Sequence, residues 1–214
     1  IGGVWARSLS HGGLEKPVVF PPHGGLPADI ELGRSPIDVA FVAAPTSDTM
    51  GNCSGKYGKS ACGSLGYAFA DAMFAKKVVV ITDNLVPYPL ADFSISEAYV
   101  DYVVPVESIG NPAGIVSGTT KITRDPVGLV MAQYAAKVIE HSGLLKDGMS
   151  FQTGAGGASL AVNTMLRPIM EEKDIHMSFA IGGITKPMCD LLDAGLVRNI
   201  VDAQAFDLGA IESI

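Results

Sequence analysis

Short apolar runs alternate with helix-like patterns along most of this chain, and the alternation predicts strands and helices in turn. Continuous apolar runs of strand length occupy residues 37–43 and 78–82, and a further strand is predicted at residues 177–181. Such runs are typical of strands that are buried on both faces of a parallel sheet. Helix-like patterns occupy residues 65–75 and 127–141. The order of these segments predicts an α/β fold with mostly parallel sheets and flanking helices.

The most clearly bounded segment is the predicted helix at residues 127–141. Asp125 can cap its first turn, Pro126 suits the first helical position, and Gly143 can end it. Residues 142–148 are the best candidate for a boundary between two parts, 1–142 and 143–214. The remaining predictions are strands at 18–20, 99–104, 149–151 and 200–205, helices at 28–32, 160–173 and 187–194, and loops at 1–11, 46–66, 85–89 and 108–118.

Composition narrows the functional classes without choosing a substrate. The chain has 214 residues, of which 48% are hydrophobic and 17% charged, and this favours a well-buried core. A net charge of −7 argues against a nucleic-acid-binding surface. Cys53, Cys62 and Cys189 form no metal-ligand spacing and indicate a reducing compartment. No apolar run approaches the roughly 18 residues of a membrane span. Because the first residue is Ile1, we expect a piece of a longer chain.

The strongest candidate for chemistry is the stretch at residues 149–162. A short apolar run leads into Thr153-Gly154-Ala155-Gly156-Gly157, and a helix-like pattern follows. Glycine permits left-handed backbone and lets a ligand approach the main chain closely. Free N–H groups at a helix start suit an anion or a developing oxyanion. The stretch therefore predicts a site for a phosphate, a carboxylate or a thioester oxygen, with a plain connecting turn as the alternative.

Other motifs are weaker. The glycine turn does not complete a dinucleotide-binding motif, because Ser159 replaces the third glycine and Asp174 precedes the next predicted strand. A phosphate-binding P-loop and a nucleophile elbow are both absent from the sequence. A histidine beside two glycines, His23-Gly24-Gly25, is a second candidate turn. Candidate polar side chains at strand ends and in loops are Asp48, Asp83, Glu97, Asp207, Lys56, Lys59 and Lys121.

Five stretches together resemble the citrate lyase alpha chain family, which is related to family I CoA-transferases. They are residues 23–25, 37–55, 78–89, 144–162 and 178–207. The resemblance implies a CoA-transferase-like fold of the NagB/RpiA/CoA-transferase type, built from tandem related α/β domains. Residues 1–142 would then be the later part of the first domain, and residues 143–214 the opening part of the second.

The resemblance also implies a reaction and its partners. In this family citrate replaces acetate on a CoA-type thioester, ahead of citryl cleavage to oxaloacetate and an acetyl thioester. No permanently bound cofactor or metal is implied, because CoA or the CoA-derived arm of an acyl carrier protein is the thioester substrate. The implied partners are the carrier protein (gamma chain), the citryl lyase beta chain and further copies of the chain. The implied location is the bacterial cytoplasm, with no nucleic acid or membrane involved.

By the same resemblance, the glycine turn and three other places form the site. Backbone N–H groups of Ala155, Gly156 and Gly157 are the oxyanion candidates, and no catalytic nucleophile or acid/base is assigned within the 214 residues. The alternatives are an acetyl-CoA hydrolase, another carboxylate CoA-transferase, or a non-catalytic scaffold subunit. The predicted thioester-binding residues are Thr153, Gly154, Gly156, Gly157 and Asn52, and the predicted substrate-binding residues are His23, Gly24, Gly25, Gly182 and Gly183.

Overall fold

The computed structural model describes residues 3–115, 121–154, 156–201 and 204–213. The chain divides into two compact units, residues 1–36 and residues 37–214, which are described separately. The first unit contains the helices α1 (Gly3–Ser10) and α2 (Gly25–Glu31). Helix α1 replaces the loop predicted at residues 1–11, and residues 18–20 do not form the predicted strand.

The first sheet of the second unit is parallel and has the order β1-β4-β6. Its strands are β1 (Val39–Ala44), β4 (Lys77–Thr82) and β6 (Tyr102–Pro105), and helix α3 (Gly66–Phe74) follows β1 along the chain. Side chains of β1 alternate, so that Val42 is 3% exposed whereas Phe41 is 70% exposed. The prediction that this strand is buried on both faces is therefore wrong for this chain, because the core covers only one face.

A second, smaller sheet lies within the region that the sequence predicted as loop. Its order is β3-β2-β5, with β2 and β3 antiparallel and β2 and β5 parallel. The loop predictions at 46–66 and 85–89 are thus wrong in part. These short elements and the two short helices that follow are β2 (Thr46–Asp48), β3 (Cys53–Ser54), β5 (Leu85–Val86), η1 (Glu97–Tyr99) and α4 (Pro112–Ile115).

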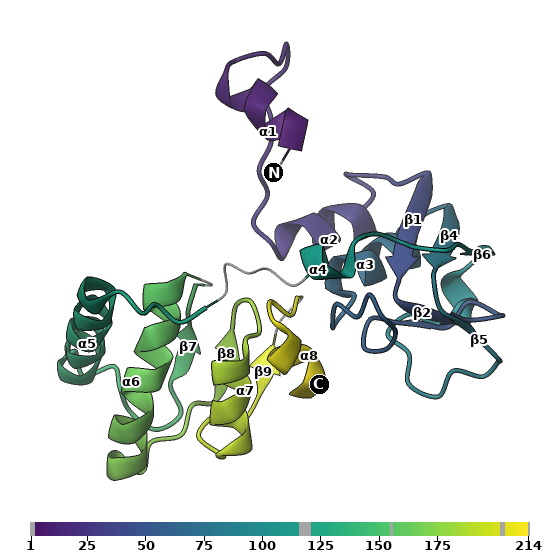
Figure 1. Cartoon of the computed structure of the whole chain (residues 1–214). Helices are drawn as coiled ribbons and strands as arrows, with labels where there is room; N and C mark the ends of the chain where they lie inside the picture. Colours follow the sequence, from purple (N-terminus) through teal and green to yellow (C-terminus); the bar gives the residue numbers. More distant parts are fainter. Residues whose placement is uncertain (1–2, 116–120, 155, 202–203, 214) are drawn as a thin grey trace. The chain divides into compact units, whose positions relative to one another are not determined.

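The third sheet is again parallel, in the order β7-β8-β9, and its helices lie beside it in Figure 1. Its core is a cluster that includes Met177 and Ala180, packed against Leu166 and Met170 of the first helix after β7. The elements of this part are α5 (Pro126–His141), β7 (Ser150–Gln152), α6 (Gly157–Lys173), β8 (Phe179–Ile181), α7 (Lys186–Asp193), β9 (Ile200–Val201) and α8 (Leu208–Ser213).

Helix α5 begins as the sequence predicts. The Asp125 carboxylate accepts a hydrogen bond from the Gly128 N–H at 2.8 Å, and Pro126 occupies the first turn. The helix packs against α6, and Ala136 belongs to the same core cluster as Leu166. This packing groups α5 with the later strands, while the domain boundary at residue 142 stays a prediction. Among the described residues, no helix is long and apolar enough to cross a membrane.

Candidate functional site

The carboxyl ends of β7 and β8 lie next to each other, and each leads into a glycine turn. The two strands are parallel, with Gln152 paired to Ile181 at their last positions. Ligands of open parallel sheets bind outside the carboxyl ends of the strands. The register therefore places the turn after β7 beside Gly182 and Gly183, at the sheet edge where this rule expects a site.

Gly182 is held directly against the predicted thioester-binding turn. Its φ is +118°, and a Cβ at this position would lie 2.9 Å from the Thr153 carbonyl oxygen. A larger residue would meet both backbone strain and a clash with main-chain atoms. At Gly183, a Cβ would fall 1.3 Å from Cε2 of Phe206, so the ring occupies the side-chain space of that residue. The structure thus brings Thr153 and Gly182 together, as candidate residues from two separate motifs.

The glycines after β7 do not adopt the left-handed backbone that the sequence predicted. Gly154, Gly156 and Gly157 all lie outside the left-handed region, so the expected positive φ is wrong for them. At Gly157 a Cβ would lie 2.8 Å from the Lys121 carbonyl oxygen, which makes close packing the reason for glycine. At Gly156 the nearest atom would be Ser159 Oγ at 3.9 Å, so the fold leaves open space there. Ala155, an oxyanion candidate, lies outside the described residues.

The first turn of α6 presents main-chain donors at this edge. Gly156 is the N-cap residue and provides no side-chain hydrogen bond to the helix. In an α-helix the N–H groups of the first turn have no partner within the helix, here those of Gly157, Ala158 and Ser159. Thr153 Oγ1 lies 2.9 Å from the Gly154 carbonyl oxygen and ties the turn together. Such N–H groups, with the positive end of the helix dipole, suit an anionic oxygen.

Two polar residues near this edge are occupied by structural contacts. Asp207 accepts hydrogen bonds from the N–H groups of Lys186, at 3.0 Å, and of Ala210, at 2.7 Å. It therefore holds the starts of α7 and α8. Lys186 Nζ lies 2.9 Å from Asp190, and that hydrogen bond raises the pKa of the lysine. The Lys186–Asp190 pair is an i,i+4 contact within α7, whereas the bond from the Lys186 N–H to Asp207 joins two separate segments.

Asp48, a candidate at the end of β2, is a buried hydrogen-bond centre. Its Oδ1 accepts from the N–H groups of Met50, Gly51 and Asn52 at 2.8–3.1 Å. Its Oδ2 accepts from Asn52 Nδ2 at 2.8 Å and from the Leu90 N–H at 2.9 Å. Burial on its own raises the pKa of Asp48, but these hydrogen bonds outweigh burial and hold the pKa below its usual value.

The same network uses both ends of the Asn52 side chain. Asn52 Nδ2 donates to Asp48, and Asn52 Oδ1 accepts from the Glu97 N–H at 3.0 Å. The residue is 2% exposed. Its predicted role in thioester binding stays a prediction, and the contacts seen in the structure position the loop at residues 48–52.

Asp83 directly follows β4, and its side chain is fully buried. Its Oδ2 accepts from Ser60 Oγ and from the Ile109 N–H, both at 3.2 Å, and Lys59 Nζ lies 3.5 Å away. Burial on its own raises the pKa of Asp83. The hydrogen bonds and the nearby lysine charge together outweigh burial, so the pKa lies below its usual value. The other carboxylate oxygen, Oδ1, has no hydrogen-bond partner in the described part of the chain.

The remaining candidates lie elsewhere. In the unit of residues 1–36, His23 and Gly24 are exposed and Gly24 is the N-cap residue of α2. The Gly25 N–H donates to the Pro22 carbonyl oxygen at 2.8 Å. The substrate-binding role of this turn stays a prediction. Of the other polar candidates, Lys56 pairs with Asp92 at 2.9 Å, Lys121 is exposed, and the Glu97 N–H contacts Asn52.

A buried polar group near the glycine turn has no sequence signature at all. Asn163 of α6 is 1% exposed, and neither its Oδ1 nor its Nδ2 has a hydrogen-bond partner within the described ranges. It lies two helical turns after Gly156, on the helix whose start forms the candidate site. A single asparagine in a helix is ordinary in sequence, so only the structure reveals its burial.

Comparison with known proteins identifies close relatives over the whole chain. The family profile described as "Citrate lyase, alpha subunit (CitF)" matches residues 1–214. The citrate lyase alpha chain of Escherichia coli (strain K12) is 46% identical over 212 residues, covering 99% of this chain and 42% of that protein. The chain therefore spans less than half the length of the curated relatives that it matches.

Solved structures give the same result for the fold. The alpha subunit of citrate lyase from Streptococcus mutans, in complex with citrate, superposes with a TM-score of 0.86 at 50% identity. That match covers 94% of this chain and 39% of the other. A 4-hydroxybutyrate CoA-transferase from Porphyromonas gingivalis matches with a TM-score of 0.51 at 20% identity, covering 87% of this chain and 44% of the other. At that identity the likeness concerns the fold, and it confirms the CoA-transferase-like α/β class predicted from sequence.

Proposed function

Because the chain belongs to the citrate lyase alpha subunit family, we propose that it forms part of a citrate CoA-transferase subunit. The observation that carries this proposal is the family match along all 214 residues. The activity would belong to the longer protein, since the chain spans 42% of the length of its E. coli relative. The glycine-rich edge of sheet β7-β8-β9 supports the proposal by offering backbone donors to an anionic oxygen.

The proposed reaction exchanges acyl groups on a thioester. Citrate and an acetyl thioester give a citryl thioester and acetate. The acetyl carbon–sulfur bond breaks and a carbon–sulfur bond forms to a citrate carboxyl carbon, while one carbon–oxygen bond of that carboxyl group breaks and its oxygen leaves as part of the acetate. Each acyl transfer passes through a tetrahedral species that carries a negative oxygen. Preorganised N–H groups at the start of α6 would stabilise this oxygen, because their dipoles are fixed before the charge develops.

The thioester carrier and the protein partners extend the proposal. We expect the thioester to be held on CoA or on the CoA-derived arm of an acyl carrier protein, as a substrate and not as a resident cofactor. The citryl product would then pass to a lyase beta chain. The Streptococcus mutans relative was crystallised with citrate, which supports citrate as the acceptor acid. We place the assembly, with several copies of the alpha chain, in the bacterial cytoplasm.

The residues of the proposed site follow from the geometry described above. Thr153 and Gly182 lie together at the sheet edge, and Gly156 has open space for a ligand to approach. We propose that Gly156 and Gly157 contribute main-chain contacts to the thioester. Gly154 and Gly183 flank the same edge and complete the proposed surface.

The reaction itself can be tested with the longer protein, acetyl-CoA and citrate, with products followed by mass spectrometry. CoA substitutes for the carrier arm because its thiol end is chemically similar. Formation of citryl-CoA together with acetate is the expected result. Acetate without citryl-CoA would instead indicate a hydrolase. No product, even after the carrier protein is added, would favour a scaffold subunit and contradict the proposal.

A further inference from the structure

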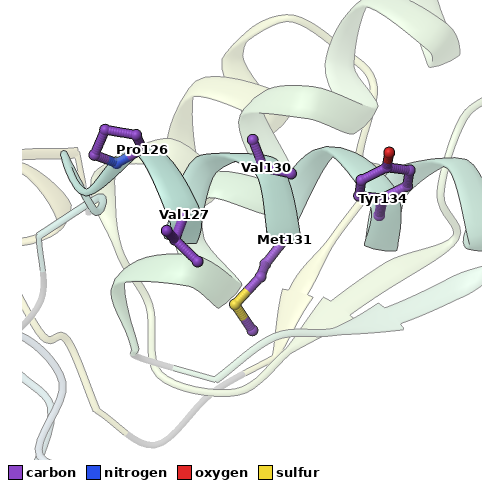
Figure 2. A pocket seen from close by; sticks show the side chains of 5 residues that line it. All are labelled: Pro126, Val127, Val130, Met131 and Tyr134. Carbon is purple, nitrogen blue, oxygen red and sulfur yellow. The ribbon is translucent and has the colours of Figure 1, made fainter.

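Helix α5 has apolar side chains on two opposite faces. Its inner face carries small buried residues, Gly128, Ala132 and Ala136, and the helix packs against α6. Its outer face carries large apolar side chains that are 49–66% exposed: Val127, Val130, Met131 and Tyr134. Figure 2 shows these four side chains and Pro126 along one side of the helix. One further turn along, Val138 continues the same exposed stripe.

The polar part of α5 is too narrow for a helix that faces water. Successive residues are about 100° apart around a helix. Between Val127 and Glu140 the polar residues Gln133, Lys137 and Glu140 lie on one side, so the apolar arc covers roughly 260°, and the next polar residue is His141 at the end of the helix. A helix that is apolar nearly all round is typical of a buried position. The sequence of α5 therefore matches a helix that is covered on its outer face as well.

The outer face also has a shape that suits a packed neighbour. Pro126, Val127, Val130, Met131 and Tyr134 line a shallow, open depression of about 280 Å³. The lining comes from a single helix and lacks convergent polar groups, which a small-molecule site would use to orient its ligand. Lys137 Nζ lies 5.8 Å from the centre of the Tyr134 ring, at the polar border of the stripe. Apolar side chains of a neighbouring element would fill such a depression.

A second apolar surface in the same part of the chain is uncovered. In sheet β7-β8-β9, Phe179, Ile181 and Val201 are exposed, whereas Ala180 points into the core and is fully buried. Parallel sheets are normally covered on both faces. They also usually contain about four to six strands, and this one has three among the described residues. Within the described part of residues 37–214, both surfaces lack the neighbours that such a sheet and its helices ordinarily have.

We propose that the outer face of α5 is an interior surface of the longer polypeptide, covered by a segment that these 214 residues do not include. The E. coli relative has room for such a segment, because the matched region is only 42% of its length. A second copy could cover α5 by pairing the helix with itself, but that contact would leave the apolar sheet face bare. Further chain of the same polypeptide can cover both surfaces. This inference does not depend on the transferase activity.

Two variants of the longer protein test the proposal in a matched way. Val130→Asp places a charge in the apolar stripe, and Gln133→Asp places the same charge on the polar strip of the same helix. We expect Val130→Asp to lower Tm by about 5 °C or more relative to Gln133→Asp, because an unpaired buried carboxylate is costly. Equal Tm values for the two variants would overturn the proposal.

Oxidative footprinting of the unsubstituted longer protein gives a second readout in case Val130→Asp fails to fold. Met131 is 60% exposed in this chain, whereas Met170 is fully buried. We expect Met131 to be oxidised as slowly as Met170, with the urea-unfolded protein as reference. Oxidation at the unfolded rate would overturn the proposal. Protection of Met131 that is lost on dilution would also overturn the proposal, because it indicates a second copy. Protection that appears only when a carrier or lyase chain is added would overturn it as well.

Discussion

The Asp48 network yields a quantitative prediction about the stability of the loop at residues 48–52. Asp48→Asn keeps the shape of the side chain. It also keeps one oxygen that can accept the three N–H hydrogen bonds now made to Oδ1. The new NH₂ group would face the Leu90 N–H and Asn52 Nδ2, so two hydrogen bonds to a charged acceptor become donor–donor contacts. Hydrogen bonds to charged groups are worth roughly 1.5–3 kcal/mol each, and relief from burying a carboxylate offsets part of this loss. We expect a net loss of about 3 kcal/mol.

The assay is urea unfolding of both forms, followed by circular dichroism, with Asp92→Asn as the matched control. Asp92 bonds to Lys56 and Tyr57, but its side chain is 51% exposed. Exposed pairs contribute about 1 kcal/mol or less. If Asp48→Asn unfolds within about 1 kcal/mol of Asp92→Asn, the account of the buried network is refuted.

The stability difference between the parent and Asp48→Asn should depend on pH. The pKa of Asp48 is lowered in the folded state, so the carboxylate contributes stability above its unfolded pKa of about 3.9. That contribution is lost as the pH falls through the lower folded pKa. The stability difference between the parent and Asp48→Asn should therefore be constant near neutral pH and shrink below about pH 4.

Four further substitutions test the glycine edge and the buried amide. Gly182→Ala should destabilise the fold by about 1–3 kcal/mol, measured by urea unfolding, because its Cβ would meet the Thr153 carbonyl oxygen and its φ is positive. Gly157→Ala should lower Tm whereas Gly156→Ala should leave it nearly unchanged, since only the former meets backbone atoms; equal shifts would contradict this reasoning. Asn163→Leu should raise stability by about 1 kcal/mol by removing an unpaired buried amide, and a loss would show that the amide has a partner such as a buried water.

Local sequence signals predicted the elements whose start is marked by neighbouring residues in the sequence. Helix α5 was predicted because Asp125 and Pro126 mark its start within four residues of sequence. Helix α1 was missed because it is only eight residues long and begins at a glycine, with no Ser, Thr, Asp or Asn before it to mark its start. Strands β2 and β3 were missed because their Ser, Thr and Asp residues resemble a loop. In the structure these polar residues are buried, and Asp48 accepts hydrogen bonds from residues 50–52 and from the distant Leu90 N–H.

The candidate site was predicted in position but not in its physical details. The strand, glycine turn and helix start near Gly156 are as expected, yet the glycines there do not adopt left-handed backbone. Gly182 and Gly183 require glycine because of Thr153 and Phe206, and these neighbours lie in the segments that follow β7 and β9. Contacts between distant segments cannot be deduced from spacing within one motif. The exposed face of β1 could not be predicted either, because all six of its residues are apolar and the sequence therefore shows no alternation.

The most direct test of the proposed thioester site is the exchange rate of Gly156→Val in the longer protein. Gly156 has open space in the fold, so valine should leave the unfolding transition within about 1 kcal/mol of the parent. The valine side chain would occupy the space through which a thioester oxygen approaches the start of α6. We predict that citryl-CoA formation falls by about 100-fold or more, the scale seen when an oxyanion contact is lost. Exchange at a near-normal rate in the folded variant would contradict the central claim that this sheet edge holds the thioester.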